Sequence, residues 1–259
     1  MSGTNRTREA EAEALPKGPE VVLVRPQLGE NIGAAARAMW NFGLDRLRLV
    51  APRDGWPAPR AVAMASGATR VLDGARLFPE VAEAVDDLHY VYATTARSSR
   101  DVLKPVLTPE QAMADAVARM ARGEKVGLMF GPERAGLENE DLLSAQAYVT
   151  VPANPAFASL NLGQCVLLLA YEWRRQASAA VPAPVPEGWE VPAARGNVDR
   201  MLDHLEAELT KGNYFWPEDR GPSMRANLRN LFHRAPLTDQ DLRTLWGVIR
   251  TLAEGRRRR

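Results

Sequence analysis

Five short runs of mainly apolar residues recur along the first part of the chain, and helix-like segments separate them. The runs span residues 21–24, 47–50, 89–93, 126–130 and 148–151, and each has the length of a β-strand. A strand without a polar face needs cover on both sides, and parallel sheets obtain that cover from helices. The pattern therefore predicts an α/β fold with a parallel sheet between two layers of helices.

Helices are expected over residues 32–42, 109–123, 138–144 and 160–176. The second begins with a capping box, in which Thr108 is the N-cap, Pro109 takes the first helical position and Gln111 follows three residues after the cap. The last is apolar almost all round through residues 165–169, so we expect it to be buried.

Composition divides the chain into four parts. Residues 1–19 are polar and predict a flexible N-terminal arm, and residues 20–178 hold the α/β pattern. Residues 179–194 are rich in proline, which is typical of a stiff linker. Residues 195–259 have a helical texture and predict a small, all-helical C-terminal extension.

Charge is balanced over the whole chain but not along it. The 33 lysines and arginines face 32 acidic residues, which gives no general argument for a polyanionic partner. From Arg220 to the end, however, ten arginines face three acids, a local excess of +7. This excess favours a polyanion that docks on the C-terminal extension, although a solvated helix face with a basic end explains it equally well.

Several classes of protein are disfavoured. The lone Cys165 cannot form an internal disulfide, and with three histidines the chain offers no zinc cluster, so we expect no metal and a reducing, cytoplasmic setting. No apolar run is long enough for a membrane span of about 20 residues. The G-x-G-x-x-G, G-x-x-x-x-G-K-[ST] and G-x-S-x-G motifs of dinucleotide enzymes, P-loop NTPases and serine hydrolases do not occur.

The candidate chemistry lies in loops that follow the expected strands, because open parallel sheets bind ligands at the carboxyl ends of their strands. Four loops stand out, at residues 25–37, 94–100, 131–137 and 154–162. In the first loop, Asn31 is placed to cap the helix that follows it. In the fourth loop, Ser159 is placed to cap the helix expected over residues 160–176. Arg37 is a charged residue among alanines, and its spacing alone favours a side chain that reaches solvent.

Three motifs in these loops carry a resemblance. They are Asn31-Ile32-Gly33-Ala34-Ala35-Ala36-Arg37 with Asn41-Phe42-Gly43 behind it, Phe130-Gly131-Pro132-Glu133-Arg134-Ala135-Gly136-Leu137, and Ser159-Leu160-Asn161-Leu162. In this order they resemble the SpoU branch of the SPOUT superfamily, which methylates ribose 2′-hydroxyls in RNA. The segment 94–97 and the helical extension with Leu228-Arg229-Asn230-Leu231-Phe232 are most similar to the TrmJ subgroup of tRNA methyltransferases.

The resemblance implies a parallel-sheet SPOUT domain with a C-terminal trefoil knot, S-adenosyl-L-methionine as cofactor, and a homodimer in which each active site takes its arginine from the other subunit. The residues it assigns to the cofactor are Thr94, Thr95, Ala96, Gly131, Val151, Ala158, Ser159 and Leu160. The residues it assigns to catalysis are Arg37, Glu133, Ser159 and Asn161. The TrmJ subgroup implies a tRNA substrate methylated at nucleotide 32 of the anticodon loop.

Two other hypotheses stay open. The same fold and chemistry serve ribosomal RNA, since the first two motifs do not encode which RNA is recognised. A SPOUT protein that binds RNA without catalysis is the second alternative, and the intact set of candidate catalytic residues argues against it.

A guanidinium with a pKa above about 12 is a poor base. We therefore expect Arg37 to clamp a phosphate beside the target ribose, while Ser159 and Asn161 orient the hydroxyl.

Overall fold

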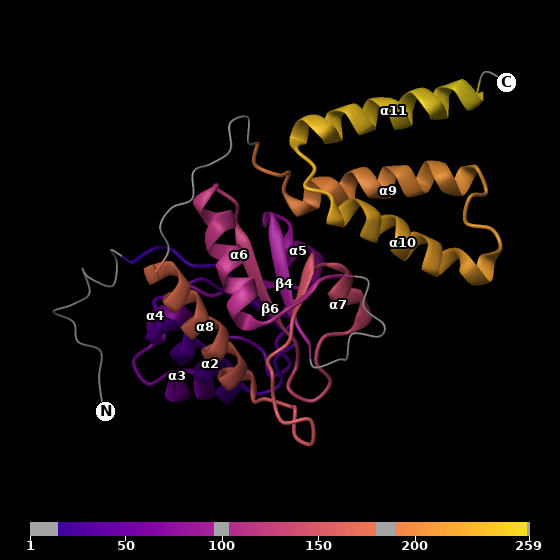
Figure 1. Ribbon diagram of the computed structural model, residues 1–259. Helices are drawn as coiled ribbons and strands as arrows, with labels where there is room; N and C mark the ends of the chain where they lie inside the picture. The colour runs from indigo at the N-terminus through magenta and orange to yellow at the C-terminus, as the bar shows by residue number, and fades with distance from the viewer. Residues whose placement is uncertain (1–14, 96–103, 180–189, 258–259) are drawn as a thin grey trace.

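The computed structural model describes residues 15–95, 104–179 and 190–257 (Figure 1). Within these ranges it confirms the α/β prediction, with seven parallel strands in the order β3-β2-β1-β6-β4-β7-β5. The strands are β1 (Glu20–Val24), β2 (Leu47–Val50), β3 (Arg76–Phe78), β4 (Tyr90–Thr94), β5 (Val106–Leu107), β6 (Val126–Phe130) and β7 (Ala147–Val149).

Helices cover both faces of the sheet because its strands are apolar on both faces. In β1, Val21 and Leu23 belong to the core shared with one helical layer, and Val22 and Val24 to the core shared with the other. The first layer contains α2 (Gly29–Asn41), α3 (Pro59–Ala65), α4 (Thr69–Asp73), α6 (Pro109–Ala121) and α8 (Leu162–Ala179). The second contains α5 (Val81–Val85) and α7 (Asn139–Leu143).

Small residues in α2 allow its neighbours to approach closely. A Cβ on Gly33 would lie 2.2 Å from the carbonyl oxygen of Ala61 in α3, and a Cβ on Gly163 of α8 would lie 2.9 Å from the Cβ of Ala34. The protein's own helices therefore make both close approaches, which hold α2 against α3 and against the start of α8.

One buried arginine, Arg48, links two strands to α5 near the amino ends of the strands. The side chain of Arg48 in β2 is 1% exposed and donates to Glu20, to Asp87 at 2.5 Å and to the carbonyl oxygen of Ala84 at 2.8 Å. Burial by itself would raise the pKa of Asp87, but hydrogen bonds and charge from Arg48 lower it to about 2. The ion pair therefore ties β1, β2 and the end of α5 together over the ordinary pH range.

Several expectations from the sequence need correction. The short strands β3 and β5 were not predicted, because they lie at the two edges of the sheet and are partly exposed. The expectation that the helix after residue 160 is buried all round is wrong for the single chain. Leu167 and Leu168 are 38% and 37% exposed and Tyr171 is 49% exposed, because α8 packs on the rest of the domain with one face. The capping box of Thr108 and Gln111 is confirmed.

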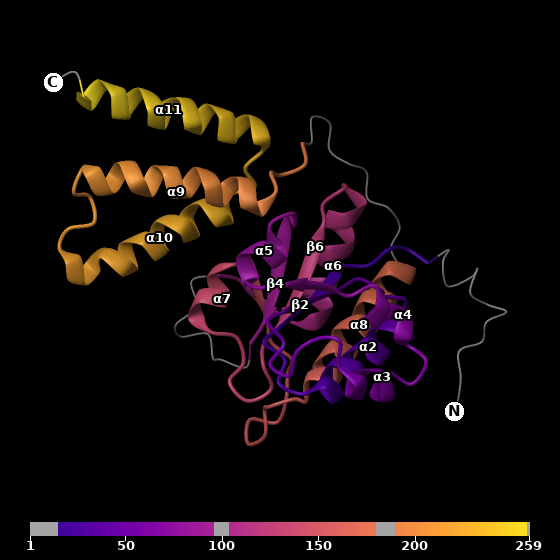
Figure 2. The ribbon, with the colours of Figure 1, turned by 180° about the vertical axis from the view of Figure 1, so that it is seen from behind.

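The C-terminal extension is helical, as predicted, with α9 (Arg195–Lys211), α10 (Gly221–Arg234) and α11 (Asp239–Arg257). Its three helices project from the α/β part, with α9 between the other two (Figure 2). Met201, Leu202, Leu242 and Ile249 are buried in its own small core. The Arg195 backbone N–H donates to the carbonyl oxygen of Leu88, which fixes the start of α9 against the α/β part.

Ion pairs consume part of the basic charge that the sequence places in this extension. Arg229 of α10 contacts Asp199, Asp203 and Glu206 on one face of α9, and Arg225 contacts Glu206 as well. The whole extension, residues 195–259, holds thirteen basic and nine acidic residues, a net +4. The +7 counted from Arg220 therefore overstates the charge that is free to meet a partner.

Within the described ranges no helix is long and apolar enough to cross a membrane. The described residues also contain no group of three or more histidine, cysteine or acidic side chains placed to hold a metal ion.

Candidate functional site

A cavity of about 390 Å³ lies at the carboxyl ends of three adjacent strands, β6, β4 and β7. Because the sheet order places these strands side by side, the loops that follow them converge even though they are far apart in the sequence. The cavity is lined by Thr94, Thr95, Phe130, Gly131, Pro132, Glu133, Arg134, Ala135, Gly136, Leu137, Val149, Val151, Ala158, Ser159, Leu160, Leu162 and Cys165.

The structure gathers almost all residues that the sequence assigned to a cofactor. Seven of the eight line this one cavity: Thr94, Thr95, Gly131, Val151, Ala158, Ser159 and Leu160. The eighth, Ala96, lies outside the described residues. The walls also include side chains that no motif in the sequence singled out for this cavity, among them Cys165. Burial raises the pKa of the Cys165 thiol to about 11, so it stays protonated at neutral pH.

The loop from Gly131 to Leu137 folds back on itself to form one wall. A Cβ on Gly131 would lie 2.3 Å from the backbone nitrogen of Leu137 and 2.4 Å from the carbonyl carbon of Gly136. Gly136 has a φ of +67°, a conformation that glycine adopts without strain. A side chain at Gly131 would push the loop open, and one at Gly136 would strain its backbone, so the wall depends on both glycines.

One hydrogen-bonded chain joins all three sequence motifs beside the cavity. Glu133 accepts from the Asn31 side-chain amide at 2.6 Å and from the backbone nitrogen of Gln27 at 2.9 Å. The amide of Asn161 then donates to Asn31 Oδ1 at 3.2 Å. The carboxylate on the β6 loop thereby fixes α2, and α2 fixes the start of α8.

Two capping assignments from the sequence were wrong. Asn31 is not an N-cap, since α2 begins at Gly29 and its cap position, Leu28, has no side-chain hydrogen bond. Asn161, rather than Ser159, caps α8, because its Oδ1 accepts from the backbone nitrogens of Gly163 at 2.9 Å and Gln164 at 3.4 Å. The long-range bonds from Glu133 and Asn161 draw Asn31 away from the local role that its position in the sequence suggested.

Arg37 is the candidate catalytic residue that the single chain does not bring to the cavity. It lies on α2, its side chain is exposed, and it is not among the residues that line the cavity. This agrees with the exposure that its spacing favoured. Within one chain, Glu133 and Ser159 line the cavity, and Asn161 supports it from the network.

The helix α7, which follows the Gly131–Leu137 loop, is anchored at both ends. At its start, Asp141 pairs with Arg25, which follows β1, and accepts from the Glu138 backbone nitrogen at 2.8 Å. At its end, the buried Lys104 Nζ donates to the carbonyl oxygens of Leu142, Leu143 and Ala145 at 2.7–3.0 Å. Burial and the nearby charge of Arg195 lower the pKa of Lys104 to about 7. No motif or pattern in the sequence predicted this contact of Lys104 with α7.

Two family models match the chain. The description SpoU rRNA Methylase family applies to residues 19–171, which is more than half of the chain. The description tRNA methyltransferase TrmJ, C-terminal domain, applies to residues 196–259. The two matches fall on the α/β part and on the helical extension.

Individual relatives agree with these models. The tRNA (cytidine/uridine-2′-O-)-methyltransferase TrmJ of Pectobacterium atrosepticum is 36% identical over 230 residues, 88% of this chain and 94% of the relative. The crystal structure of TrmJ from Z. mobilis ZM4 is 52% identical, with a TM-score of 0.79 over 90% of this chain and 98% of that one. A third structure, which was described as giving insights into the 2-OH methylation of C/U34 on tRNA, is 26% identical to this chain. Its TM-score is 0.51, and the match covers 64% of this chain and 99% of that one.

The two capping assignments give different predictions for stability. Asn161→Ala removes the cap of α8 and the bond to Asn31, so we expect the free energy of unfolding to fall by about 1–2 kcal/mol. Ser159→Ala removes neither the cap nor the bond to Asn31, so it should change the free energy of unfolding by less than about 0.5 kcal/mol. Urea denaturation monitored by circular dichroism measures both. A larger loss for Ser159→Ala than for Asn161→Ala would contradict the assignment.

Proposed function

The chain belongs to the SpoU methylase family of RNA 2′-O-methyltransferases and carries a TrmJ-type C-terminal domain, and from this we propose that it methylates the ribose of nucleotide 32 in the tRNA anticodon loop. The observation that carries the proposal is that the second and third SpoU-like motifs line a single cavity, while Asn31 of the first motif is hydrogen-bonded to Glu133 and Asn161 beside it.

The cavity fits S-adenosylmethionine, which SpoU methyltransferases use. Leu137, Val151 and Leu160 offer apolar walls for a purine ring, and the loop that begins at Gly131 lines the same cavity. When bound, this cofactor supplies an electrophilic methyl group on a sulfonium. We assign its binding to the seven predicted residues that line the cavity.

The residues of the chain then have to hold the ribose in line and let a proton leave. Transfer needs the 2′-oxygen about 3 Å from the methyl carbon, so positioning provides most of the rate. Ser159 lines the cavity and is our candidate to orient the hydroxyl. Both polar atoms of Asn161 already have partners, so we assign it a positioning role through Ser159 and α8 rather than contact with the RNA.

Arg37 is the candidate phosphate clamp, and we propose that a second copy of the chain delivers it. Arg37 is exposed on α2, which packs against α8, and α8 presents the exposed apolar side chains Leu167, Leu168 and Tyr171. Exposed apolar surface of this kind is typical of a subunit interface. A homodimer through this face would place the arginine of one subunit near the cavity of the other, with the trefoil knot of the family as the expected threading of the chain.

The helical extension is our candidate for tRNA recognition and the reason we favour position 32. The enzyme acting on C/U34 matches 64% of this chain and nearly all of its own length, so about a third of this chain has no counterpart there. The unmatched third of the chain is long enough to contain the whole TrmJ-type domain at residues 196–259. The relatives named TrmJ, in contrast, align over most of this chain. Ribosomal RNA is a less favoured alternative, because the TrmJ relatives act on tRNA by name.

Methylation of a tRNA transcript followed by nuclease digestion and mass spectrometry tests the target. We expect a mass increase of one methyl group in the fragment that contains nucleotide 32, dependent on S-adenosylmethionine. A ribosomal RNA fragment serves as the competing substrate. Methylation at nucleotide 34, or of the ribosomal fragment alone, would overturn the assignment.

Arg37→Lys tests the clamp. Lysine keeps the charge but cannot make the paired hydrogen bonds of a guanidinium, so we expect kcat/KM for tRNA to fall at least tenfold, or about 1.4 kcal/mol. Calorimetry should find the affinity for the cofactor unchanged, because the proposal gives Arg37 a phosphate of the RNA, and not the cofactor, as its partner. Turnover close to that of the wild type would rule out a bidentate clamp.

The salt dependence of tRNA binding tests the extension. Arg220, Arg243 and Arg250 make no ion pair with the described residues, and each phosphate contact contributes about 0.9 to the slope of log K against log salt. Replacing all three with glutamine should lower the slope by about 2 to 3 if each meets a phosphate. Replacing the ion-paired Arg53 on the α/β part is the control. An unchanged slope in the triple variant would assign these charges to solubility.

A further inference from the structure

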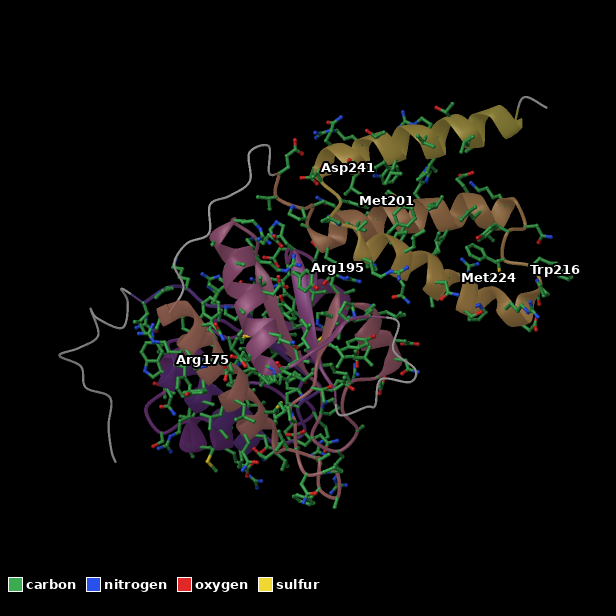
Figure 3. The ribbon with its side chains drawn as sticks, in the orientation of Figure 1. Arg175, Arg195, Met201, Trp216, Met224 and Asp241 are labelled. Atoms are coloured by element: carbon green, nitrogen blue, oxygen red, sulfur yellow. The ribbon has the colours of Figure 1, made fainter. Side chains whose placement is uncertain are left out.

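A second cavity, of about 340 Å³, lies between the α/β part and the helical extension. On the α/β side it is bounded by His89 and Tyr90 at the start of β4 and by Gln146 just before β7. It therefore lies at the amino ends of the strands, at the opposite edge of the sheet from the candidate methylation site. On the other side it is bounded by Arg195 of α9, which Figure 3 places at the junction of the two parts, and by residues 232–237.

The charged side chains that line this cavity are all basic. They are Arg119, Arg195 and Arg234, joined by the imidazoles of His89 and His233, and none of the described lining residues is aspartate or glutamate. Three carboxylates contact these arginines but do not themselves line the cavity. Arg119 pairs with Asp115 and Glu124, and Arg195 Nε lies 3.5 Å from Asp199. The surface that faces the cavity is nevertheless free of negative charge.

Arg195 is buried without a full set of hydrogen-bond partners. Its side chain is 3% exposed, and although its Nη2 donates to the Leu143 carbonyl oxygen at 3.0 Å, its Nε and Nη1 have no hydrogen-bond acceptor among the described residues. Burial lowers the pKa of Arg195 to about 10, so the guanidinium stays charged at neutral pH. An unsatisfied buried guanidinium in the wall favours an anion in the cavity.

Three side chains that line the cavity, those of His89, Gln146 and Arg234, still offer hydrogen-bond donors to a ligand. His89 Nδ1 accepts from the Lys125 backbone nitrogen at 2.8 Å, which leaves the proton on Nε2. Gln146 Oε1 accepts from the Val91 backbone nitrogen at 2.8 Å, so its NH₂ group is the end left for a ligand. Arg234 is exposed and bonds to Asn230 through Nε, and its two terminal nitrogens have no acceptor in the described part of the chain.

We propose that this interdomain cavity binds the phosphate group of a nucleotide through Arg234, Gln146 and His89, with Arg195 supplying positive charge from the wall. Several convergent donors with no facing carboxylate match a phosphate, which accepts on every oxygen. The volume lies in the range of small-molecule sites, so the attached sugar fits with the phosphate. The phosphate belongs either to the RNA backbone or to a free nucleotide.

Ligand in this cavity would touch both parts of the chain. It would bond to Gln146 and His89 on the α/β side and to Arg234 at the end of α10. Because it binds only the docked arrangement, it would stabilise the attachment of the helical extension by mass action. Phosphate binding itself does not depend on the proposed methylation, whereas the RNA source of the phosphate does rest on it.

Thermal unfolding of the full chain in inorganic phosphate and in cytidine monophosphate tests the site, with sodium chloride at equal ionic strength as the reference. We expect a saturable rise in Tm for the wild type. Gln146→Glu keeps the acceptor for Val91 but puts a carboxylate where the donor was, and Arg234→Gln removes an exposed charge, so each should weaken binding at least about tenfold. Arg76→Gln, outside the cavity, is the matched control and should leave binding unchanged.

Competition with a tRNA transcript identifies the source. If the phosphate belongs to RNA, cytidine monophosphate should displace tRNA, and Gln146→Glu should weaken tRNA binding at least tenfold more than Arg76→Gln does. If the ligand is a free nucleotide, both variants should bind tRNA alike while only the control still responds to cytidine monophosphate. The absence of a phosphate-specific rise in Tm in the wild type, or an equal rise in all variants, would overturn the site even if tRNA methylation is observed.

Discussion

The hydrogen bonds of Glu133 are the contact on which the candidate active site depends. This carboxylate on the loop after β6 holds Asn31 of α2, and Asn31 holds Asn161, the cap of α8. Asn31 is thereby fixed beside the cavity to two segments that each lie more than a hundred residues further along the chain. The tight backbone turn at Gly131 and the anchors at both ends of α7 hold the remaining wall. A site that works by positioning needs rigidity of this kind.

The order of the strands explains why the two cavities described above differ in character. At the carboxyl ends of β6, β4 and β7 the loops converge around a cavity with many apolar residues in its walls. At the amino ends, the helical extension packs against the sheet edge, and its α9 brings the buried Arg195. The first cavity suits a methyl donor and the second a phosphate. Both kinds of group are present when an enzyme of this family meets RNA.

The sequence predicted the strands of the sheet interior and most of the cavity residues, and it failed where a segment's environment mattered more than its residue types. Edge strands β3 and β5 carry no continuous apolar signal, because one side of each has no neighbour. The apolar residues of α8 suggested burial, but a single chain covers one face of it and leaves Tyr171 exposed. Asn31 and Ser159 satisfied the local rule for N-caps, yet long-range partners gave Asn31 another role and Asn161 took the cap.

The sequence by itself determined the α/β class, the helical C-terminal part and seven of the residues that line the candidate cofactor cavity. It could do so because apolar periodicity and loop motifs are local properties of the chain. The tertiary structure alone decided that the loops after β6, β4 and β7 meet, that Arg37 lies away from the cavity of its own chain, and that a basic cavity opens between the two parts. These features depend on contacts between residues distant in sequence, such as Lys104 with α7 and Arg195 with Leu143, which no local pattern encodes.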